Sequence, residues 1–389
     1  MTAKSSHPNR IALVLSALAL LLGVTSVLSA TTYLYVESNI GNPANQNSVF
    51  GFASDGAGQL NALPGSPYLT GGSGVFASGG TQFNADQEVT ADPAGTLLYA
   101  VDGGSNTIGA FAINGDGTLT KVPGSPFPSG GPNPVSIGIS GRFLVVANKN
   151  EDPRQDPNVD LPNYTTFTVN SDGSLVLNPG STIDLPRGSS PSQALVWPKG
   201  RVVFGLELKT SRIASYKFNR AGLMTEMGSV SPPVPPSVFL GEILHPTKKI
   251  LYVGLLRSNE LGVYRFDASG VMTYVTSIQN NGLDICWLKT NAAGTRLYTS
   301  ESVSNTLTVY DISQPLAPVE IQHFSLVGPN GSVTNIALDP TESSLYALAG
   351  TAIHVLSVDA SGLLSQPGNP VPLPGLTNQR ALGLVAIRK

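Results

Sequence analysis

Charged side chains recur where short apolar segments of this chain end or begin, and four of them are suited to chemistry. Glu207 and Glu301 each end an apolar segment. A glutamate whose pKa is raised by burial can act as a general base. Arg257 and Arg380 carry guanidinium groups, which can bind a carboxylate or phosphate through two parallel hydrogen bonds. We therefore predict catalytic roles for the two glutamates and substrate-binding roles for the two arginines.

Metal or cofactor chemistry finds less support in the sequence. The 4 histidines and the single cysteine are not grouped at metal-ligand spacing. Neither a Gly-x-Ser-x-Gly elbow nor a phosphate loop is present. Residues 148–160 contain four acidic side chains, so a calcium site is one interpretation of that segment, and a solvated polar lid is the other. We predict that the protein uses no cofactor and no metal.

A repeated segment supplies the elements that position these residues. An apolar core, Leu-Tyr-Val or a close variant, recurs at intervals of 46 to 64 residues. Its copies are Leu34–Val36, Leu98–Ala100, Leu144–Val146, Val203–Gly205, Leu251–Val253, Leu297–Thr299 and Leu345–Ala347. A proline-containing turn precedes most copies, and an alternating apolar strand with an Asp-Gly or Ser-Gly hairpin follows. Four short strands in each unit of 46–48 residues is typical of a propeller blade.

Seven such units predict an all-β fold, a seven-bladed β-propeller of four-stranded antiparallel blades. Blade 1 begins at Tyr33 with its second strand, and we expect the C-terminal segment Ala381–Ala386 to supply its inner strand. The two ends of the chain would then share one sheet, which removes the open edges of the ring. Two longer intervals, Tyr68–Thr81 and Asn148–Asn163, are interpreted as insertions within a single domain of residues 31–389.

The strand order of a propeller puts the ends of the second strands and the starts of the inner strands on one face, around the central channel, where a ligand site is expected. Polar residues in the turns of the opposite face, such as His245, are expected to be structural. Channel-side candidates at the ends of second strands are Glu37, Asp102, Asn148, Lys149, Glu207, Arg257 and Glu301. Those at the starts of inner strands are Asp86, Gln193, Asp284, Asn335 and Arg380. Of these, we assign Gln193, Asp284 and Asn148 to substrate binding together with the two arginines.

The first 30 residues have the order of a secretory signal. Lys4 and Arg10 precede an apolar run that begins at Ile11, and small residues follow up to Ala30. We predict cleavage after Ser29 or Ala30 and export to the periplasm or the extracellular space. The alternative is an uncleaved membrane anchor, because Ile11–Ala30 is just long enough to span a bilayer.

Composition narrows the classes of partner. The chain has 389 residues, of which 41% are hydrophobic and 12% charged, with a net charge of −3. Lys and Arg together number 22 against 25 Asp and Glu, without a basic block, so we expect no nucleic-acid binding. Cys286 lies in an apolar run and is expected to be a buried hydrophobic residue. We further expect a monomer whose membrane contact is limited to the N-terminal segment, and a small-molecule or glycan ligand.

Over residues 33–389, the Leu-Tyr-Val cores, the Ser-Asn-Thr turns and the Asp-Gly hairpins resemble the lactonase-type seven-bladed propellers. That family includes propeller-type 6-phosphogluconolactonases and the carboxymuconate lactonising enzyme. The chain is also similar to surface-associated propellers with Tyr-Val-Thr-Asn repeats. The resemblance implies a catalytic set of His, Arg and Glu around the channel, and Glu207 in Gly205–Leu208 is similar to that glutamate. The inner strand before it, Ser192–Ala194, contains neither Arg nor His.

Two functions follow as hypotheses. The first is an exported lactonase-like hydrolase that opens a small cyclic ester at the mouth of the channel. The second is a non-catalytic propeller that binds a small molecule, a glycan or a protein in the cell envelope. His245, His323 and His354 all fall away from the channel side, so a histidine base is not expected. Convergence of the two candidate glutamates and the two candidate arginines on one pocket would favour the first hypothesis.

Overall fold

The computed structural model describes residues 1–3, 30–56, 58–76, 84–199, 201–233, 237–328, 331–376 and 380–389. The predicted signal falls mainly on residues 4–29, which lie outside the described residues. Residues Thr31–Lys389 form one compact unit. Nowhere in the described ranges does a helix have the length and apolar character needed to cross a membrane.

Within the described ranges this unit consists of seven antiparallel sheets, which we call blades 1 to 7. Blade 1 contains, from the inside outwards, β32 (Leu382–Arg388), β1 (Thr32–Glu37), β2 (Ser48–Ser54), β3 (Leu60–Ala62) and β4 (Tyr68–Leu69). Blade 2 contains β5 (Val89–Ala91), β6 (Leu97–Asp102), β7 (Thr107–Ile113), β8 (Leu119–Lys121) and β9 (Phe127–Pro128). Blade 3 contains β10 (Pro134–Ser140), β11 (Phe143–Asn148), β12 (Asn163–Val169), β13 (Leu175–Leu177) and β14 (Ile183–Asp184).

Blade 4 contains β15 (Pro191–Trp197), β16 (Val202–Glu207), β17 (Arg212–Phe218) and β18 (Met224–Val230), and blade 5 contains β19 (Phe239–Leu244), β20 (Ile250–Leu255), β21 (Glu260–Phe266) and β22 (Met272–Gln279). Blade 6 contains β23 (Ile285–Thr290), β24 (Arg296–Glu301), β25 (Thr306–Asp311) and β26 (Val319–Ser325). Blade 7 contains β27 (Val333–Leu338), β28 (Ser344–Ala349), β29 (Ala352–Val358), β30 (Leu364–Ser365) and β31 (Val371–Pro372). The predicted seven-bladed propeller is confirmed.

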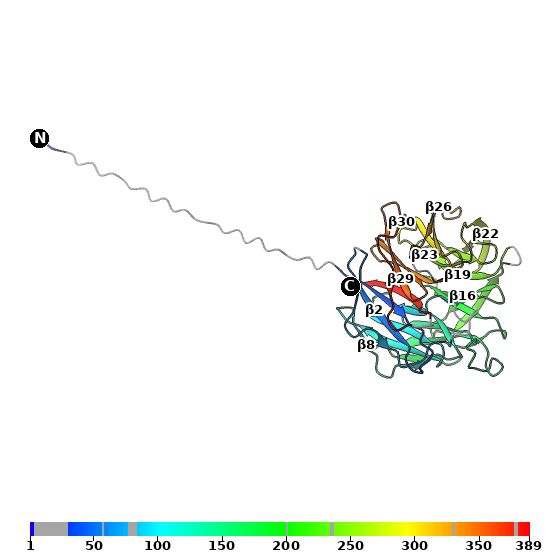
Figure 1. The fold of residues 1–389 in the computed structure, drawn as a ribbon. Helices are drawn as coiled ribbons and strands as arrows, with labels where there is room; N and C mark the ends of the chain where they lie inside the picture. The colour runs from blue at the N-terminus through cyan, green and yellow to red at the C-terminus, as the bar shows by residue number, and fades with distance from the viewer. Residues whose placement is uncertain are drawn as a thin grey trace. The chain divides into compact units, whose positions relative to one another are not determined.

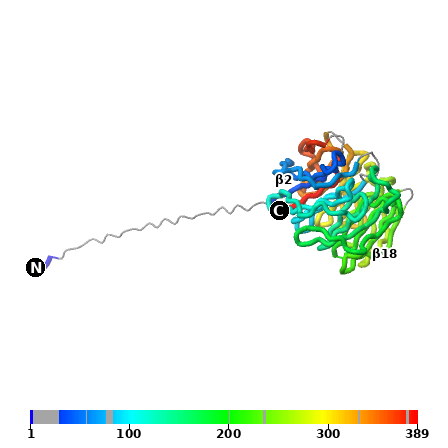
Figure 2. The backbone as a smooth tube through the Cα atoms, turned by 90° about the horizontal axis from the view of Figure 1, so that it is seen from below, coloured from blue at the N-terminus to red at the C-terminus, as the bar shows by residue number. Residues whose placement is uncertain are grey.

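The ring closes where the two ends of the unit meet. The C-terminal strand β32 pairs with β1 in an antiparallel register that places Tyr35 opposite Val385. Each inner strand also contacts the inner strand of the next blade, from β32 through β5, β10, β15, β19, β23 and β27 back to β32. Figures 1 and 2, viewed at right angles, both show the red C-terminal strand beside the blue N-terminal strands. The predicted closure is confirmed.

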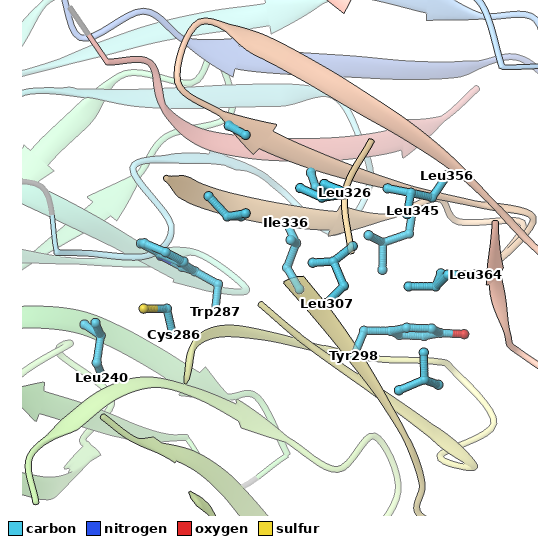
Figure 3. Close-up of a cluster of buried hydrophobic side chains, with 14 of the residues drawn as sticks. Leu240, Cys286, Trp287, Tyr298, Leu307, Leu326, Ile336, Leu345, Leu356 and Leu364 are labelled. Carbon is cyan, nitrogen blue, oxygen red and sulfur yellow. The ribbon is translucent and has the colours of Figure 1, made fainter. Parts of the chain in front are cut away.

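The hydrophobic core is divided among the spaces between neighbouring blades. One cluster joins blades 6 and 7 and contains Tyr298, Leu307, Ile336 and Leu345 (Figure 3). Cys286 belongs to the same cluster and is 1% exposed, so the expected buried thiol is confirmed. Burial also raises the pKa of this thiol to about 12, which makes the reactive thiolate unfavourable.

The Leu-Tyr-Val core of one blade is hydrogen-bonded to the Asp-Gly hairpin of the next blade. The two motifs are separate signals in the sequence. The hydroxyl of Tyr35 in blade 1 donates to the carbonyl of Gly117 in the hairpin of blade 2, at 2.7 Å. Tyr99 donates in the same way to Gly173 of blade 3, at 2.9 Å. A buried hydroxyl thus finds a partner, and each hairpin is fixed to the preceding blade.

Candidate functional site

We call the face that holds the ends of the second strands the mouth face. Five second strands end there in polar residues, namely Glu37, Asp102, Asn148, Glu207 and Glu301, as the strand order predicted. All five are at most 1% exposed. Because buried polar groups require partners, the hydrogen bonds of these residues decide what each can do.

Glu207, a predicted catalytic residue, is held within blade 4. One carboxylate oxygen accepts a hydrogen bond from Arg212 at 2.6 Å, and the other accepts one from Thr210 at 2.9 Å. Arg212 starts β17, directly opposite Glu207 across the turn between the two strands. The ion pair therefore connects the second and third strands of one blade, and the catalytic role of Glu207 stays a prediction.

Glu301, the second predicted catalytic residue, lies in a cage of neutral donors. Its carboxylate accepts hydrogen bonds from Thr299 at 2.6 Å, Thr306 at 2.9 Å and Asn280 at 3.0 Å. Burial raises the pKa of Glu301 to about 7, although these hydrogen bonds act in the opposite direction. Glu207 and Glu301 have no hydrogen-bonding partner in common among the described residues, and the role of Glu301 also stays a prediction.

The structure places the predicted binding residues at several points of the mouth face. Asn148 donates to Asn163 at 2.8 Å and is fully buried. Asp284 is half-buried, and burial raises the pKa of its carboxyl. Arg257 and Arg380 are both exposed, in the loop after β20 and directly before β32. Their proposed contacts with substrate remain predictions.

A different group of polar residues converges in the channel, because residues 84–88 cross it before β5 begins. The indole N–H of Trp287 in blade 6 donates to the carbonyl of Ala85 at 2.6 Å. The backbone N–H of Asp86 donates to the carbonyl of Ser192 in blade 4, at 3.1 Å. Lys149 of blade 3 donates to the carbonyl of Asn84 at 2.7 Å. Three blades therefore fix the segment across the channel.

The carboxylate of Asp86 is the centre of this arrangement. It forms an ion pair with Lys289 of blade 6, with 3.1 Å between Oδ2 and Nζ. Asn335 of blade 7 donates to Oδ1 at 3.1 Å, and Gln193 of blade 4 donates to Oδ2 at 3.3 Å. Asp86 is 3% exposed, whereas the side chain of Lys289 is 22% exposed. Lys289 is therefore the more accessible member of the ion pair.

Two further carboxyl groups, those of Glu88 and Glu242, complete what we call the channel cluster, which consists of Asp86, Glu88, Gln193, Glu242, Lys289 and Asn335. Glu88 Oε1 and both carboxyl oxygens of Glu242 make no hydrogen bond to any residue that the structure describes. Burial, and next the charge of Asp86, raises the pKa of Glu88 and of Glu242 well above the usual range. Both carboxyls therefore favour the protonated form.

This combination suits the hydrolysis of an ester. A carboxylate can take a proton from water, an ammonium can stabilise the oxyanion, and a protonated carboxyl can give a proton to the leaving oxygen. A cavity of about 10 Å³ borders Glu88, which is about the space that one water requires. In the described part of the chain, no group of three or more His, Cys, Asp or Glu is arranged to hold a metal ion.

Sequence reasoning found Asp86, Gln193 and Asn335 as channel-side residues but assigned no role to Glu88, Glu242 or Lys289. A signal for the last two was available. Glu242 and Lys289 are charged residues inside the apolar inner strands β19 and β23. A charged residue in such a strand is expected to face the channel rather than a hydrophobic neighbour.

The histidines lie away from the channel, as predicted. Nδ1 of His245 accepts hydrogen bonds from the backbone N–H groups of Thr247 and Lys248, so His245 stabilises a turn. His323 lies on the outer strand β26, and His354 lies on the third strand β29. None of the three histidines belongs to the channel cluster.

Comparison with solved structures shows the same fold in several bacterial proteins. A candidate 6-phosphogluconolactonase of Bacteroides fragilis superimposes with a TM-score of 0.72 and 16% identity, over 93% of this chain and 99% of that one. A protein of Lactobacillus plantarum gives a TM-score of 0.71 and 16% identity, over 92% and 100% of the two chains. A periplasmic gluconolactonase of Pseudomonas aeruginosa gives 0.65 and 16%, over 91% and 99%.

Sequence comparison adds a match to a family over part of the chain. No curated protein matches the chain. The sequence profile of the family described as lactonase, 7-bladed beta-propeller, matches residues 162–333. That range extends from the start of β12 to the start of β27 and includes Gln193, Glu242 and Lys289 of the channel cluster. The resemblance of this chain to the lactonase family of seven-bladed β-propellers is therefore confirmed.

Proposed function

We propose that the protein hydrolyses a small lactone at the channel cluster. The observation that carries the proposal is the convergence of Asp86, Lys289 and the carboxyls of Glu88 and Glu242 in a propeller whose residues 162–333 match the lactonase family. The periplasmic gluconolactonase with the same fold supports the choice of a lactone and, together with the predicted signal, our further proposal that the protein is exported.

The charged and protonated members of the cluster share the proposed reaction among them. Asp86 takes a proton from a water as the water oxygen forms a bond to the lactone carbonyl carbon. Lys289 stabilises the negative charge on the carbonyl oxygen. The ring C–O bond then breaks, and Glu88 or Glu242 gives its proton to the departing ring oxygen. The product is an open-chain hydroxy acid, and the proton held by Asp86 returns to the glutamate that donated one.

The test is an assay of the purified protein against aliphatic and sugar lactones, with acid release followed at constant pH. We expect Asp86→Asn to lower the turnover rate by about 100-fold or more, because general base catalysis contributes ~10²–10⁴-fold. Glu207→Gln is the matched variant at a strand end, and it also tests the catalytic role predicted for that residue. Circular dichroism of each variant establishes that the fold is retained.

The outcomes separate the hypotheses. Loss of activity in Asp86→Asn with activity retained in Glu207→Gln supports the channel cluster. Loss of activity in Glu207→Gln alone would assign the catalytic role to Glu207 at the strand end. Hydrolysis of no lactone contradicts the enzyme hypothesis and favours the alternative, a propeller that only binds its ligand. The low exposure of Asp86 is the observation that favours this alternative.

A further inference from the structure

A polar groove of about 470 Å³ opens on the mouth face beside blades 2 and 3. It shares no lining residue with the channel cluster. Its walls are residues 159–163 at the end of the predicted insertion, the loop 130–132 between blades 2 and 3, and residues 182–184 beside β14. The insertion, which the proposed hydrolysis does not use, therefore forms one wall of a separate cavity.

The wall that the insertion contributes is held in place from both sides. The amide of Asn150 donates to the carbonyl of Asp160 at 2.8 Å, and Arg187 donates to the same carbonyl at 3.1 Å. Both side chains also donate to the carbonyl of Pro157. Arg154, paired with Asp152, donates to two carbonyls of blade 1 loops at 3.0 Å. A wall with this many fixed backbone groups is preorganised for a ligand.

The loop 130–132 brings bare backbone to the groove at two glycines. A Cβ on Gly130 would lie 2.5 Å from Cγ2 of Thr165, and a Cβ on Gly131 would lie 2.4 Å from Nδ2 of Asn163. The φ of Gly130 is also +81°, which side chains other than glycine rarely adopt. Only glycine fits both positions without a shift of these neighbours.

The polar side chains that line the groove are two carboxylates, the amides of Asn106 and Asn163, and the hydroxyl of Thr182. Asp160 and Asp184 are exposed carboxylates on neighbouring segments of the lining, because Asn163 pairs with Asp184. The oxygen of Asn106 accepts hydrogen bonds from the backbone of Asn133 at 2.7 Å and from Gln155 at 2.9 Å, so its Nδ2 is the group available to a ligand. None of the described lining residues is Lys or Arg. The ligand must therefore bring hydroxyl or other donors, and a negative charge would be repelled.

We propose that this groove binds a neutral carbohydrate segment. Vicinal hydroxyls of a sugar can donate to Asp160 and Asp184 and accept from Nδ2 of Asn106. Val159, which is 72% exposed at the rim, offers an apolar contact to the C–H face of a sugar ring. The volume lies within the ~300–1,000 Å³ of typical small-ligand pockets and suits a short oligosaccharide. The proposal is independent of lactone hydrolysis.

The test is calorimetric titration of the purified protein with maltotriose, cellotriose and tri-N-acetylchitotriose, and with trigalacturonate as the anionic comparison. We expect one or more of the neutral trisaccharides to bind. Asp160→Asn and Asp184→Asn should each raise the Kd by about tenfold or more, because a hydrogen bond to a charged group contributes ~1.5–3 kcal/mol. The matched control is Asp172→Asn, an exposed aspartate in a hairpin of the same blade on the opposite face.

Several results would overturn the proposal. These are the absence of binding by every neutral trisaccharide at 10 mM, binding of trigalacturonate alone, and equal Kd values for Asp184→Asn and Asp172→Asn. Titrations are repeated with EDTA and with added Ca²⁺. Sugar binding that is lost in EDTA and restored by Ca²⁺ would identify the two carboxylates as cation ligands rather than as direct acceptors from sugar hydroxyls.

Discussion

The ends of the second strands and the central channel both contain buried carboxyl groups, but the two regions satisfy them differently. Both carboxylate oxygens of Glu207 and both of Glu301 accept hydrogen bonds from nearby donors. In the channel, neither oxygen of Glu242 has a partner among the described residues, and Glu88 has one on a single oxygen. Glu37 is the exception at the strand ends, because its Oε2 has no partner among the described residues. Glu207 and Glu301 differ from Glu88 and Glu242 in that all their carboxyl oxygens are satisfied within the fold.

The position of the hydrogen-bonding partners in the fold explains why these carboxyls are satisfied to different degrees. Glu207 and Glu301 find theirs on the same blade or in the loop that leads into it, so each repeat can satisfy them by itself. The channel cluster combines residues of blades 2, 4, 5, 6 and 7. Because an unsatisfied buried carboxyl lowers stability, its presence at a point where five blades meet indicates a functional reason. Three predictions test this comparison.

The largest expected effect on stability is in blade 1, at the end of its second strand β1. Asn47 is fully buried, and its amide donates to Glu37 at 2.8 Å, to Asp102 at 2.9 Å and to the carbonyl of Val101 at 3.0 Å. Asn47→Ala would leave two buried carboxyls without this donor. We expect the free energy of unfolding, measured by urea denaturation, to fall by about 4 kcal/mol.

The matched control is Asn61→Ala, which removes the same amide from an exposed position on β3 of the same blade. This change should alter the free energy of unfolding by no more than about 0.5 kcal/mol. An equal loss in the two variants would show that the strand-end hydrogen bonds do not stabilise the blade, and the contrast with the channel would disappear.

The second prediction uses the pH dependence of Glu301. Its pKa in the fold, about 7, lies above the ordinary value of 4.5. The folded state therefore binds more protons than the unfolded state between pH 4.5 and 7, and stability falls as pH rises through that window. Glu301→Gln removes this contribution. The variant should gain about 2 kcal/mol relative to the wild type between pH 5 and pH 8, measured by thermal and urea unfolding.

Glu226→Gln provides the control, because it makes the same chemical change at an exposed glutamate on β18, whose partner is the charged Arg212 rather than a cage of neutral donors. The stability difference between this variant and the wild type should not change across the window. If the difference for Glu301→Gln is equally flat, the threonine and asparagine donors stabilise the carboxylate fully, and Glu301 is ionised in the fold at pH 5.

The fold was predictable from the sequence because every blade repeats the same local signals. A hydrogen bond such as that of Tyr99 to Gly173 requires the two motifs at a constant spacing, and the repeat preserves that spacing. The strand-end residues were predictable for the same reason, since each ends a recognisable apolar core. Even the partner of Glu207 is local, because Arg212 follows it by five residues across a tight turn.

The channel cluster was predictable only in part. Asp86 and Lys289 are separated by 203 residues, and their distance depends on how the blades tilt around the axis. The crossing of the channel by residues 84–88 follows an insertion without a regular pattern, so nothing local indicates where the segment goes. Glu242 lies in the inner strand that follows Glu207 in the chain, and the sequence alone predicted no role for it.

The smallest expected effect is the sharpest test of the comparison. Replacing a carboxyl by leucine should change the free energy of unfolding in opposite directions in the two regions. Glu242→Leu removes a buried carboxyl without a described partner and keeps the backbone N–H and C=O that bond to Gln193 at 2.8 and 2.9 Å. The free energy of unfolding should rise by about 1 kcal/mol, since an apolar group of similar size is often the more stable choice at such a site. Glu301→Leu should lower it instead, because three donors lose their acceptor. Equal destabilisation by the two leucine variants would mean that the channel carboxyl is as fully satisfied as the strand-end one, and the argument that its presence reflects function would fail.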